Sequence, residues 1–248
     1  MNPISRIPLV LTVATAWWSG SPWLGGSESA SAAPLANVAV SPSAAHLVAA
    51  SLAGALRAGS CTNVSKVVAA GLTFGSTTQS GATVASQSVY FNAATGSVRL
   101  LAGVLYFKES ASLLALQFGV NDAGDANKWI SVPASNSHFH ALATGLLQAS
   151  MLSQVAPVGP LTRSPITTVN GVAVIIVRGG ANALLGLTKG AETLILHAQA
   201  PYLPIELAAA GRSQGTPTTL TVTFSHWGLR VAVSAPAGAV PITRTKLP

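Results

Sequence analysis

One short motif in this chain has the spacing of a hydrolase nucleophile. Gly211-Arg212-Ser213-Gln214-Gly215 matches the pattern G-x-S-x-G, in which a strand precedes an active serine and a helix follows it. Here Thr216 and Pro217 lead into a stretch, Leu220–Ser225, that has the character of another strand. Small polar residues between two strands are typical turn residues. We therefore interpret the motif as a turn and not as a nucleophile.

A pair of histidines is the next candidate for chemistry. His138 and His140 could offer two imidazoles to a metal, but at this spacing they share a face only on a strand, whereas the surrounding pattern is helical. No Cys, Asp or Glu lies nearby in the sequence to complete a zinc set. We interpret both as solvated histidines near a helix start. The sequence predicts no metal site and no cofactor.

Acidic residues are scarce. After the first 32 residues only five remain: Glu109, Asp122, Asp125, Glu192 and Glu206. Catalysis by paired carboxylates stays open, because partners can be distant in the chain. Asp122 and Asp125 lack the spacing of a calcium loop and fit loop and cap positions. We predict that the chain is not an enzyme. If it has a catalytic activity, His138, His140 or Ser213 would be the residues responsible.

The first 32 residues have the order of a secretory signal peptide. Arg6 is the only charge before an apolar run, Ile7–Trp18, and Ala30-Ser31-Ala32 is a small-x-small cleavage pattern. The apolar run is shorter than the roughly 20 residues that cross a bilayer. We expect a mature chain that begins near Ala33 and works outside the cytoplasm; the alternative is an uncleaved membrane anchor.

The composition favours a sheet that something must cover. Only 8% of residues are charged and 49% are hydrophobic, and the mean hydropathy is +0.51. The apolar residues are dispersed among Ser, Thr and Gly, which suits strands. The net charge is +7, but the basic residues stand singly, which favours contact with an anionic envelope surface over nucleic-acid binding. Cys61 is the only cysteine, and we expect it to be buried.

The sequence predicts an antiparallel α+β domain over residues 33–242, in which strands dominate and two or three helices accompany them. The first helix begins at Ser41-Pro42-Ser43 and ends near Arg57, and the second covers Asn136–Gln154. A Pro/Gly hinge, Pro157–Pro165, separates the two runs, and Thr243–Pro248 is expected to be a tail. The strands are expected at Val64–Val68, Val84–Ser88, Val89–Phe91, Val98–Leu101, Val104–Lys108, Ile166–Val169, Val172–Arg178, Thr193–Gln199, Pro204–Leu207, Leu220–Ser225 and Leu229–Ser234.

Several segments together resemble the LppX/LprG-type lipoproteins of the mycobacterial and actinobacterial envelope, a family with a LolA-like fold. The likeness looks closest to uncharacterised secreted members. One departure is that no Cys follows the apolar run of the signal, so the lipid anchor of the family is missing. The segments, in order, are Leu101–Lys108, Lys128–Pro133, Val169–Val172, Arg178-Gly179, Tyr202–Glu206, Thr223–Gly228 and Ala235–Ile242.

The resemblance implies a large curved antiparallel sheet, a half-barrel, with helices over its concave side and an apolar cavity between them. In better-known relatives that cavity carries acyl chains of envelope lipids. The expected function is therefore a secreted lipid-binding or lipid-carrier protein; the alternative is an interaction or sensor module with a closed core. The residues expected to line the cavity are Leu105, Phe107, Leu113, Leu116, Phe118, Phe139, Leu142, Leu146 and Leu147.

Overall fold

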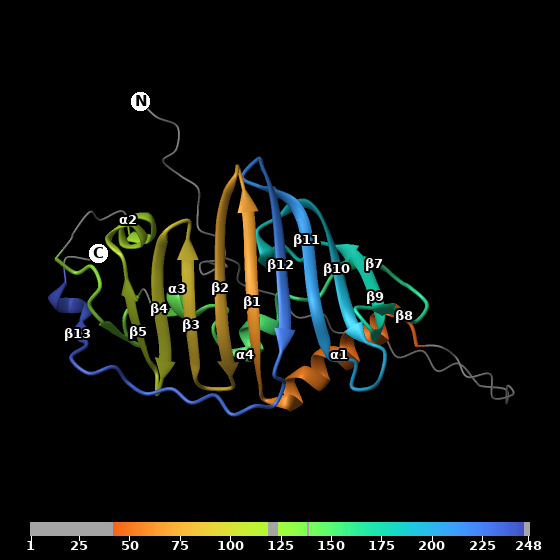
Figure 1. Cartoon of the computed structure of the whole chain (residues 1–248), viewed down its shortest axis with the longest axis horizontal. Helices are drawn as coiled ribbons and strands as arrows, with labels where there is room; N and C mark the ends of the chain where they lie inside the picture. The colour runs from red at the N-terminus through yellow and green to blue at the C-terminus, as the bar shows by residue number, and fades with distance from the viewer. Residues whose placement is uncertain (1–41, 119–123, 138, 246–248) are drawn as a thin grey trace, which may run out of the picture.

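The computed structural model describes residues 42–118, 124–137 and 139–245. Within them, a single sheet of 13 strands runs the length of the molecule in the order β13-β6-β5-β4-β3-β2-β1-β12-β11-β10-β9-β7, with β8 beside β9 (Figure 1). The strands are β1 Ser60–Ala69, β2 Leu72–Gly81, β3 Ala85–Phe91, β4 Ala94–Leu101, β5 Val104–Glu109, β6 Ile130–Pro133, β7 Val158–Arg163, β8 Thr167–Val169, β9 Val172–Gly180, β10 Thr188–His197, β11 Pro204–Ser213, β12 Thr216–Ser225 and β13 Val240–Pro241.

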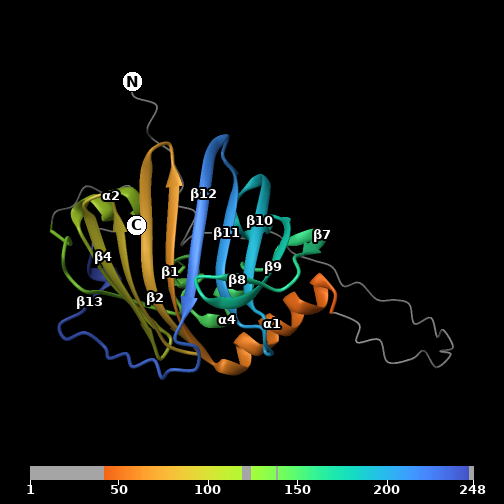
Figure 2. The same ribbon diagram turned by 45° about the vertical axis from the view of Figure 1, so that its right-hand side comes forward.

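The expected fold class is confirmed. All strand pairs are antiparallel except β13 with β6, and the sheet curves without closing (Figure 2). The helices lie against its concave side and its ends. They are α1 Ala44–Ala58, α2 Ala111–Phe118, α3 Phe139–Ala143 and α4 Gln148–Leu152, with 3-10 turns η1 Ala183–Leu185 and η2 Ile242–Arg244.

Local sequence explains where α1 begins and ends. The Ser43 side chain accepts a hydrogen bond from the His46 N–H, which caps the first turn. Gly59 takes the left-handed conformation (φ 77°), and its N–H donates a hydrogen bond to the Leu56 carbonyl. The expected first helix is therefore present. Of its leucines, Leu47 is buried, whereas Leu56 near the end of the helix is 49% exposed.

Two chain-distant strands join the halves of the sheet. β1 pairs with β12 from Thr62 opposite Ser225 to Ala69 opposite Thr218. β12 is held in turn to β11 by a tight hairpin at Gln214 (φ 47°) and Gly215 (φ 83°). Left-handed residues in a two-residue loop match the twist of a hairpin. The G-x-S-x-G motif is thus a turn between two strands, as its sequence context predicts.

The prediction of one helix over Asn136–Gln154 is wrong, because the structure has two short helices, α3 and α4, with a break between them. Gly145 is left-handed (φ 79°), and Leu147 is extended (φ −77°, ψ 147°) at the start of α4. The Thr144 hydroxyl donates to the His140 carbonyl at the end of α3, a bond that competes with helix continuation. The apolar spacing runs through the break and hides it.

The predicted Pro/Gly hinge is also wrong, since most of it forms the edge strand β7. Within the described residues, β7 pairs only with β9, and its register shifts between Val158 and Thr162. A proline has no N–H to give to a ladder, and an edge strand tolerates it because one side of the strand has no partner. Pro160 stands in that irregular part of the strand.

No strand forms at Leu229–Ser234, which corrects another prediction. The neighbouring strand β12 already has β1 on one side and β11 on the other. Residues 226–239, the C-terminal strap, instead run along one rim of the sheet to β13 (Figure 1). The strap is fixed by a bond of 2.6 Å from the Ser60 hydroxyl to the Leu229 carbonyl and by one of 3.1 Å from Arg99 Nη1 to the Ser234 carbonyl.

The chain ends are only partly described. The expected signal peptide, residues 1–32, and residues 33–41 lie outside the described residues. The predicted tail starts within η2, because Thr243 and Arg244 belong to that turn and Ile242 is buried. Residues 246–248 lie outside the described part.

Candidate functional site

The concave face of the sheet holds two large apolar clusters. The first, which we call the α1 cluster, lies where β9–β12 and the start of β1 meet α1 and α4. Its most buried side chains, at 0% exposure, include Leu47 of α1 and Leu194 of β10. The cluster consists of Ala44, Leu47, Val48, Ala55, Cys61, Met151, Leu152, Val155, Ile175, Val177, Leu187, Leu194, Leu196, Leu207, Ala209, Leu220, Val222 and Phe224.

The second, which we call the α3 cluster, lies over β3–β6 at the other end of the face. Strands supply Ala85, Val98, Leu100, Leu105, Phe107, Ile130 and Val132, and the helical segments supply Leu114, Phe139, Leu142, Leu146 and Ile242. Both halves of one sheet face therefore bury their apolar side chains against helical segments, as the hydrophobic face of a sheet must.

The structure brings together seven of the nine residues expected to line a cavity. Leu105, Phe107, Phe139, Leu142 and Leu146 are members of the α3 cluster, with Phe118 and Leu147 packed against it. The rings of Phe107 and Phe118 stack with centroids 5.6 Å apart.

The remaining two expected residues lie elsewhere on α2. Leu113 belongs to a small third cluster with Phe74 and Val89. Leu116 is 37% exposed, although residues three apart are neighbours on a helix surface. The buried side chains of α2 are Leu113 and Leu114, so the buried face is centred between those two and Leu116 lies at its margin.

A polar strip separates the α1 cluster from the α3 cluster at the centre of the face. Its members alternate along β1, β2 and β3, so they point to the same side of the sheet. Strand order places them between β12 and β4. All are buried, from 0% exposure for Ser80 to 8% for Gln87. We define the polar strip as Asn63, Ser65, Ser76, Thr78, Ser80 and Gln87.

Cross-strand hydrogen bonds connect the strip. The hydroxyls of Ser65 and Ser76 lie 2.8 Å apart. Gln87 Nε2 donates to Thr78 Oγ1 at 2.9 Å and to Ser76 Oγ at 3.3 Å. Asn63 Nδ2 donates to Ser80 Oγ at 3.3 Å. Gln87 Oε1 is buried without a hydrogen-bond partner among the described residues, an uncommon state for a buried polar atom.

Sequence reasoning missed this strip. Strand β2 was not predicted, because its inward positions carry Ser76, Thr78 and Ser80 in place of apolar residues. Alternation of hydroxyls with Gly, Thr and Gln gives no hydrophobic period. The signal that could have found it is the run of β-compatible Thr and Ser residues between the two turns that bound the strand.

Two hollows open near opposite ends of the sheet. One of about 450 Å³ lies between β5, β6 and the end of the C-terminal strap, and includes Tyr106, Pro133 and Pro241. The other, of about 530 Å³, lies near the start of α1 and is lined by Pro42, Arg163, Ser164, Pro165, Ile166, Ile175, Ala198 and Tyr202. Both volumes fall in the range of small-molecule pockets. The second combines apolar walls with one guanidinium.

Two buried carboxyl groups are the most perturbed acids. Burial raises the pKa of Glu109 and that of Glu192 to about 7. Glu192 is 1% exposed, and its Oε2 accepts a hydrogen bond of 2.9 Å from the Asn182 N–H, which lowers the pKa in part. The two acids stand on β5 and β10, which are separated by six strands. They therefore form no catalytic pair.

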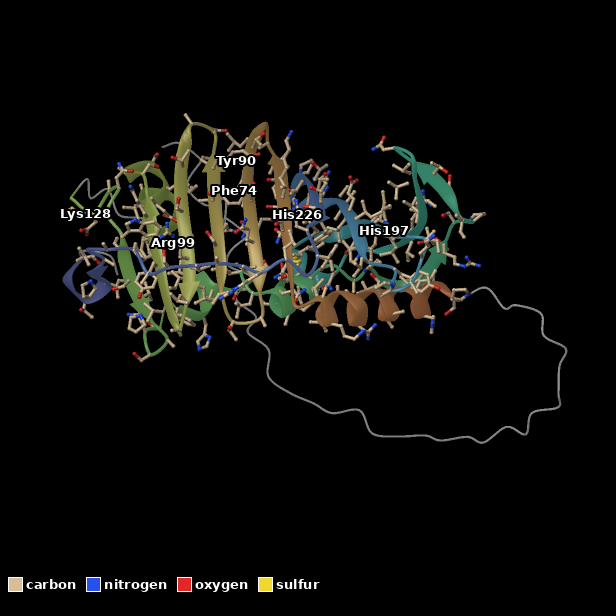
Figure 3. All side chains as sticks on the ribbon, turned by 60° about the horizontal axis from the view of Figure 1, so that its bottom comes forward. Phe74, Tyr90, Arg99, Lys128, His197 and His226 are labelled. Carbon is tan, nitrogen blue, oxygen red and sulfur yellow. The ribbon has the colours of Figure 1, made fainter. Side chains whose placement is uncertain are left out.

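The remaining candidates for chemistry are dispersed. His140 is exposed on α3, and its ring meets that of Phe139 edge-on. His197 and His226 lie apart on the surface (Figure 3). His138 and Asp122 lie outside the described residues, and Asp125 stands in a turn. In the described part of the chain, no three His, Cys, Asp or Glu side chains gather as metal ligands would.

Cys61 is buried and free, as expected. Burial raises the pKa of its thiol to about 12, which a hydrogen bond with the Asn63 side chain lowers in part. Among residues 42–118, 124–137 and 139–245, no helix has the length and apolar character to cross a membrane.

Fold and site together define an open-sheet α+β protein with an apolar concave face divided by a buried polar strip. No protein-family model and no curated protein matches the sequence. Among solved structures, the lipoprotein LppX of Mycobacterium tuberculosis is 16% identical, with 76% of this chain and 98% of that chain covered and a TM-score of 0.46. LprF from Mycobacterium bovis is 15% identical, with 79% and 97% covered and a TM-score of 0.47.

A third solved structure, a DUF1329 family protein from Desulfovibrio piger, is 9% identical over 75% of this chain and 95% of that one, with a TM-score of 0.29. LppX is one of the two proteins after which the family that the sequence resembles is named. These likenesses concern the fold alone.

Proposed function

We propose that this chain is a secreted, non-enzymatic lipid-binding or lipid-carrier protein of the bacterial cell envelope. The observation that supports it is the concave face, where two apolar clusters lie on one curved sheet. The helices pack most closely on β1, β4, β5, β7 and β11. The polar strip lies between these contacts on the inner side of β1–β3, and its side chains are buried.

Physical chemistry favours acyl chains on such a surface. Each methylene removed from water contributes about 0.8 kcal/mol, so a chain of ordinary length binds by apolar contact alone. The helices that flank the face are short: α3 and α4 have five residues each. The left-handed Gly145 breaks the backbone between them.

The basic character of the chain supports a place at the envelope. Its net charge is +7, which favours peripheral contact with anionic surfaces. Export would leave a mature N-terminus near Ala33 without an acyl group. The intact mass of the protein in culture supernatant measures this directly, and a diacylated or uncleaved product would contradict it.

One observation favours a second candidate, a closed interaction or sensor module. Leu105 is 0% and Phe107 1% exposed, so the α3 cluster is packed as tightly as an ordinary core. In a closed core, extra volume is costly, typically 1–3 kcal/mol. In a ligand site, extra volume displaces the ligand instead.

Tryptophan substitutions separate the two candidates. Leu142→Trp and Leu146→Trp add volume on the sheet-facing side of the helical segment, and Leu116→Trp, at a position 37% exposed, is the matched control. Protein from a lipid-rich actinobacterial host is extracted with organic solvent and analysed by mass spectrometry, and its unfolding in urea is measured.

The lipid-binding proposal expects lipid in the wild type and in Leu116→Trp, and a loss of lipid in the two buried variants with little change in the free energy of unfolding. Wild-type protein without extractable lipid, together with strong destabilisation of both buried variants, would replace it with the closed module.

A further inference from the structure

The hollow near the start of α1, which we call the Arg163 hollow, places one cation within apolar walls. It has a volume of about 530 Å³ and lies where α1 begins beside the β7 edge of the sheet (Figure 2). Arg163 is half-buried and is the only charged residue among the eight described residues that line the hollow. Five of the eight are apolar: Pro42, Pro165, Ile166, Ile175 and Ala198.

Strand pairing fixes Arg163 on the inner side of the sheet. It stands opposite Val177 of β9, a buried member of the α1 cluster, and residues directly opposite each other point to the same side. The Ser164 hydroxyl accepts a hydrogen bond of 3.0 Å from the Ile176 N–H and donates one of 2.7 Å to the Pro165 carbonyl. The backbone at the end of β7 is therefore held in place without a ligand.

The guanidinium of Arg163 has no hydrogen-bond or ion-pair partner in the described part of the chain. Glu192, an acid on β10 two strands away, accepts its hydrogen bond from the Asn182 N–H instead. Residues 33–41, which precede Pro42, contain no acidic residue. Because a guanidinium among apolar walls is stabilised by an opposite charge, the hollow is suited to an anion from outside the chain.

The apolar walls are suited to a hydrocarbon chain. Ile166 is 65% exposed, the largest exposed fraction among the large hydrophobic side chains of the described residues, and contact with a chain would remove it from water. Ile175 belongs to the α1 cluster, and Ala198 and Tyr202 pack against that cluster. The hollow therefore adjoins the cluster from outside, and a chain can lie in it while the packed core stays closed.

We propose that the Arg163 hollow binds a long-chain monocarboxylate, with the carboxylate on the Arg163 guanidinium and the alkyl chain against Ile166 and Ile175. This inference rests on the proposed function and names its ligand class. The parallel N–H groups of a guanidinium match the two oxygens of a carboxylate. One cation balances one negative charge, so a carboxylate fits the hollow better than a phosphate, whose charge is close to −2.

Two probes that differ in one charge test the proposal on the unmodified protein. The first is the fluorescent fatty acid cis-parinaric acid, and the second is its methyl ester, which keeps the chain and lacks the carboxylate. We expect the wild type to bind the acid roughly 5- to 20-fold more tightly at neutral pH. This range lies between that of an exposed ion pair and that of a buried hydrogen bond to a charged group.

A pair of arginine substitutions assigns the preference to one side chain. In Arg163→Gln the affinities for the acid and the ester should become equal within about twofold. Arg178→Gln is the matched control and should keep the preference. It removes the same charge from the same end of the sheet, but Arg178 stands opposite Thr162 and is exposed on the other side. Urea unfolding of each variant shows that it is folded.

A second pair of substitutions locates the alkyl chain. Ile166→Ser should weaken the binding of both probes by roughly 2- to 10-fold, because the chain loses an apolar contact, while the preference for the acid remains. Leu229→Ser, at a position 58% exposed on the C-terminal strap, is the matched control and should bind both probes like the wild type. Both side chains are exposed, so neither change removes a core contact.

The outcomes separate this inference from the proposed function. Equal wild-type affinities for acid and ester, a preference that persists in folded Arg163→Gln, or an equal loss in Arg178→Gln would overturn the carboxylate site and leave lipid binding intact. Unchanged binding in Ile166→Ser, or displacement of the probe by butyrate as effective as by palmitate, would overturn the place of the chain. Tighter binding of lysophosphatidate than of palmitate would overturn the carboxylate assignment. Wild-type protein that binds neither probe would overturn lipid binding and, with it, this site.

Discussion

The buried Gln148 side chain of α4 donates a hydrogen bond of 2.7 Å from Nε2 to the Ala55 carbonyl near the end of α1. The last four carbonyls of a helix lack intrahelical partners. Here the Gly59 N–H donates its hydrogen bond to the Leu56 carbonyl and not to that of Ala55. Gln148 therefore satisfies a carbonyl that the helix itself leaves open. This bond fixes α4 to α1 across the concave face.

Replacing that glutamine should weaken the fold. Gln148→Leu keeps the side-chain volume but leaves the Ala55 carbonyl buried and unpaired, so the free energy of unfolding should fall by about 1–3 kcal/mol. Urea denaturation measures this, with Gln79→Leu on the exposed face of β2 as the control, where a change within about 0.5 kcal/mol is expected. Equal midpoints for the two variants would show that the bond contributes nothing.

The two buried acids predict how stability depends on pH. Burial raises the pKa of Glu109 and Glu192 from 4.5 to about 7, so the folded chain holds these protons to a higher pH than the unfolded chain. The free energy of unfolding should therefore decrease as pH rises from about 4.5 to about 7, and stay level above that. The melting temperature should be higher at pH 5 than at pH 8.

The doubly substituted Glu109→Gln, Glu192→Gln chain provides the control for this pH dependence. Neutral amides imitate the protonated acids, so the difference in melting temperature between pH 5 and pH 8 should shrink by more than half. A wild-type melting temperature that increases with pH over this interval would contradict the assignment.

The sequence predicts those parts of the fold in which apolar residues recur at a regular spacing. Leu47 and the cap at Ser43 identify α1, and alternation at Val104–Lys108 identifies β5. Strand β2 has no such alternation of apolar residues, because its inner face is Ser76, Thr78 and Ser80. The single long helix was predicted because apolar spacing continues across Gly145, whose left-handed backbone breaks it.

The same contrast holds for the candidate site, where apolar residues are predicted from the sequence and the polar strip is not. Seven of the nine expected lining residues are gathered at the α3 cluster, since apolar spacing indicates a buried face. The polar strip depends on which residues of neighbouring strands lie opposite each other, such as Thr78 of β2 opposite Gln87 of β3. That register comes from hairpin geometry, and a single sequence gives no direct indication of it.

Cys61 should be chemically quiet in the folded protein. Its side chain is 2% exposed, and burial raises the pKa of the thiol to about 12, so little thiolate exists at neutral pH. Labelling with a maleimide at pH 7 should be slower than in urea-unfolded protein by more than about tenfold. A Cys61→Ser variant gives the background, and rapid labelling of the native chain or a disulfide-linked dimer would contradict the burial.

The G-x-S-x-G segment offers a direct test of turn against nucleophile. Gly215 has a φ of 83° with no neighbouring atom within 4 Å of an added Cβ, so Gly215→Ala should cost about 1–2 kcal/mol through backbone strain alone. Ser213, opposite Thr216 in the hairpin, has no role in that strain, and Ser213→Ala should change the free energy of unfolding by less than about 0.5 kcal/mol. Urea denaturation of both variants tests this.

In parallel, incubation with p-nitrophenyl butyrate should release no p-nitrophenol above the buffer rate in either variant or in the wild type. Ester hydrolysis by the wild type that disappears in Ser213→Ala, while stability is unchanged, would make the serine a nucleophile and the hairpin its support.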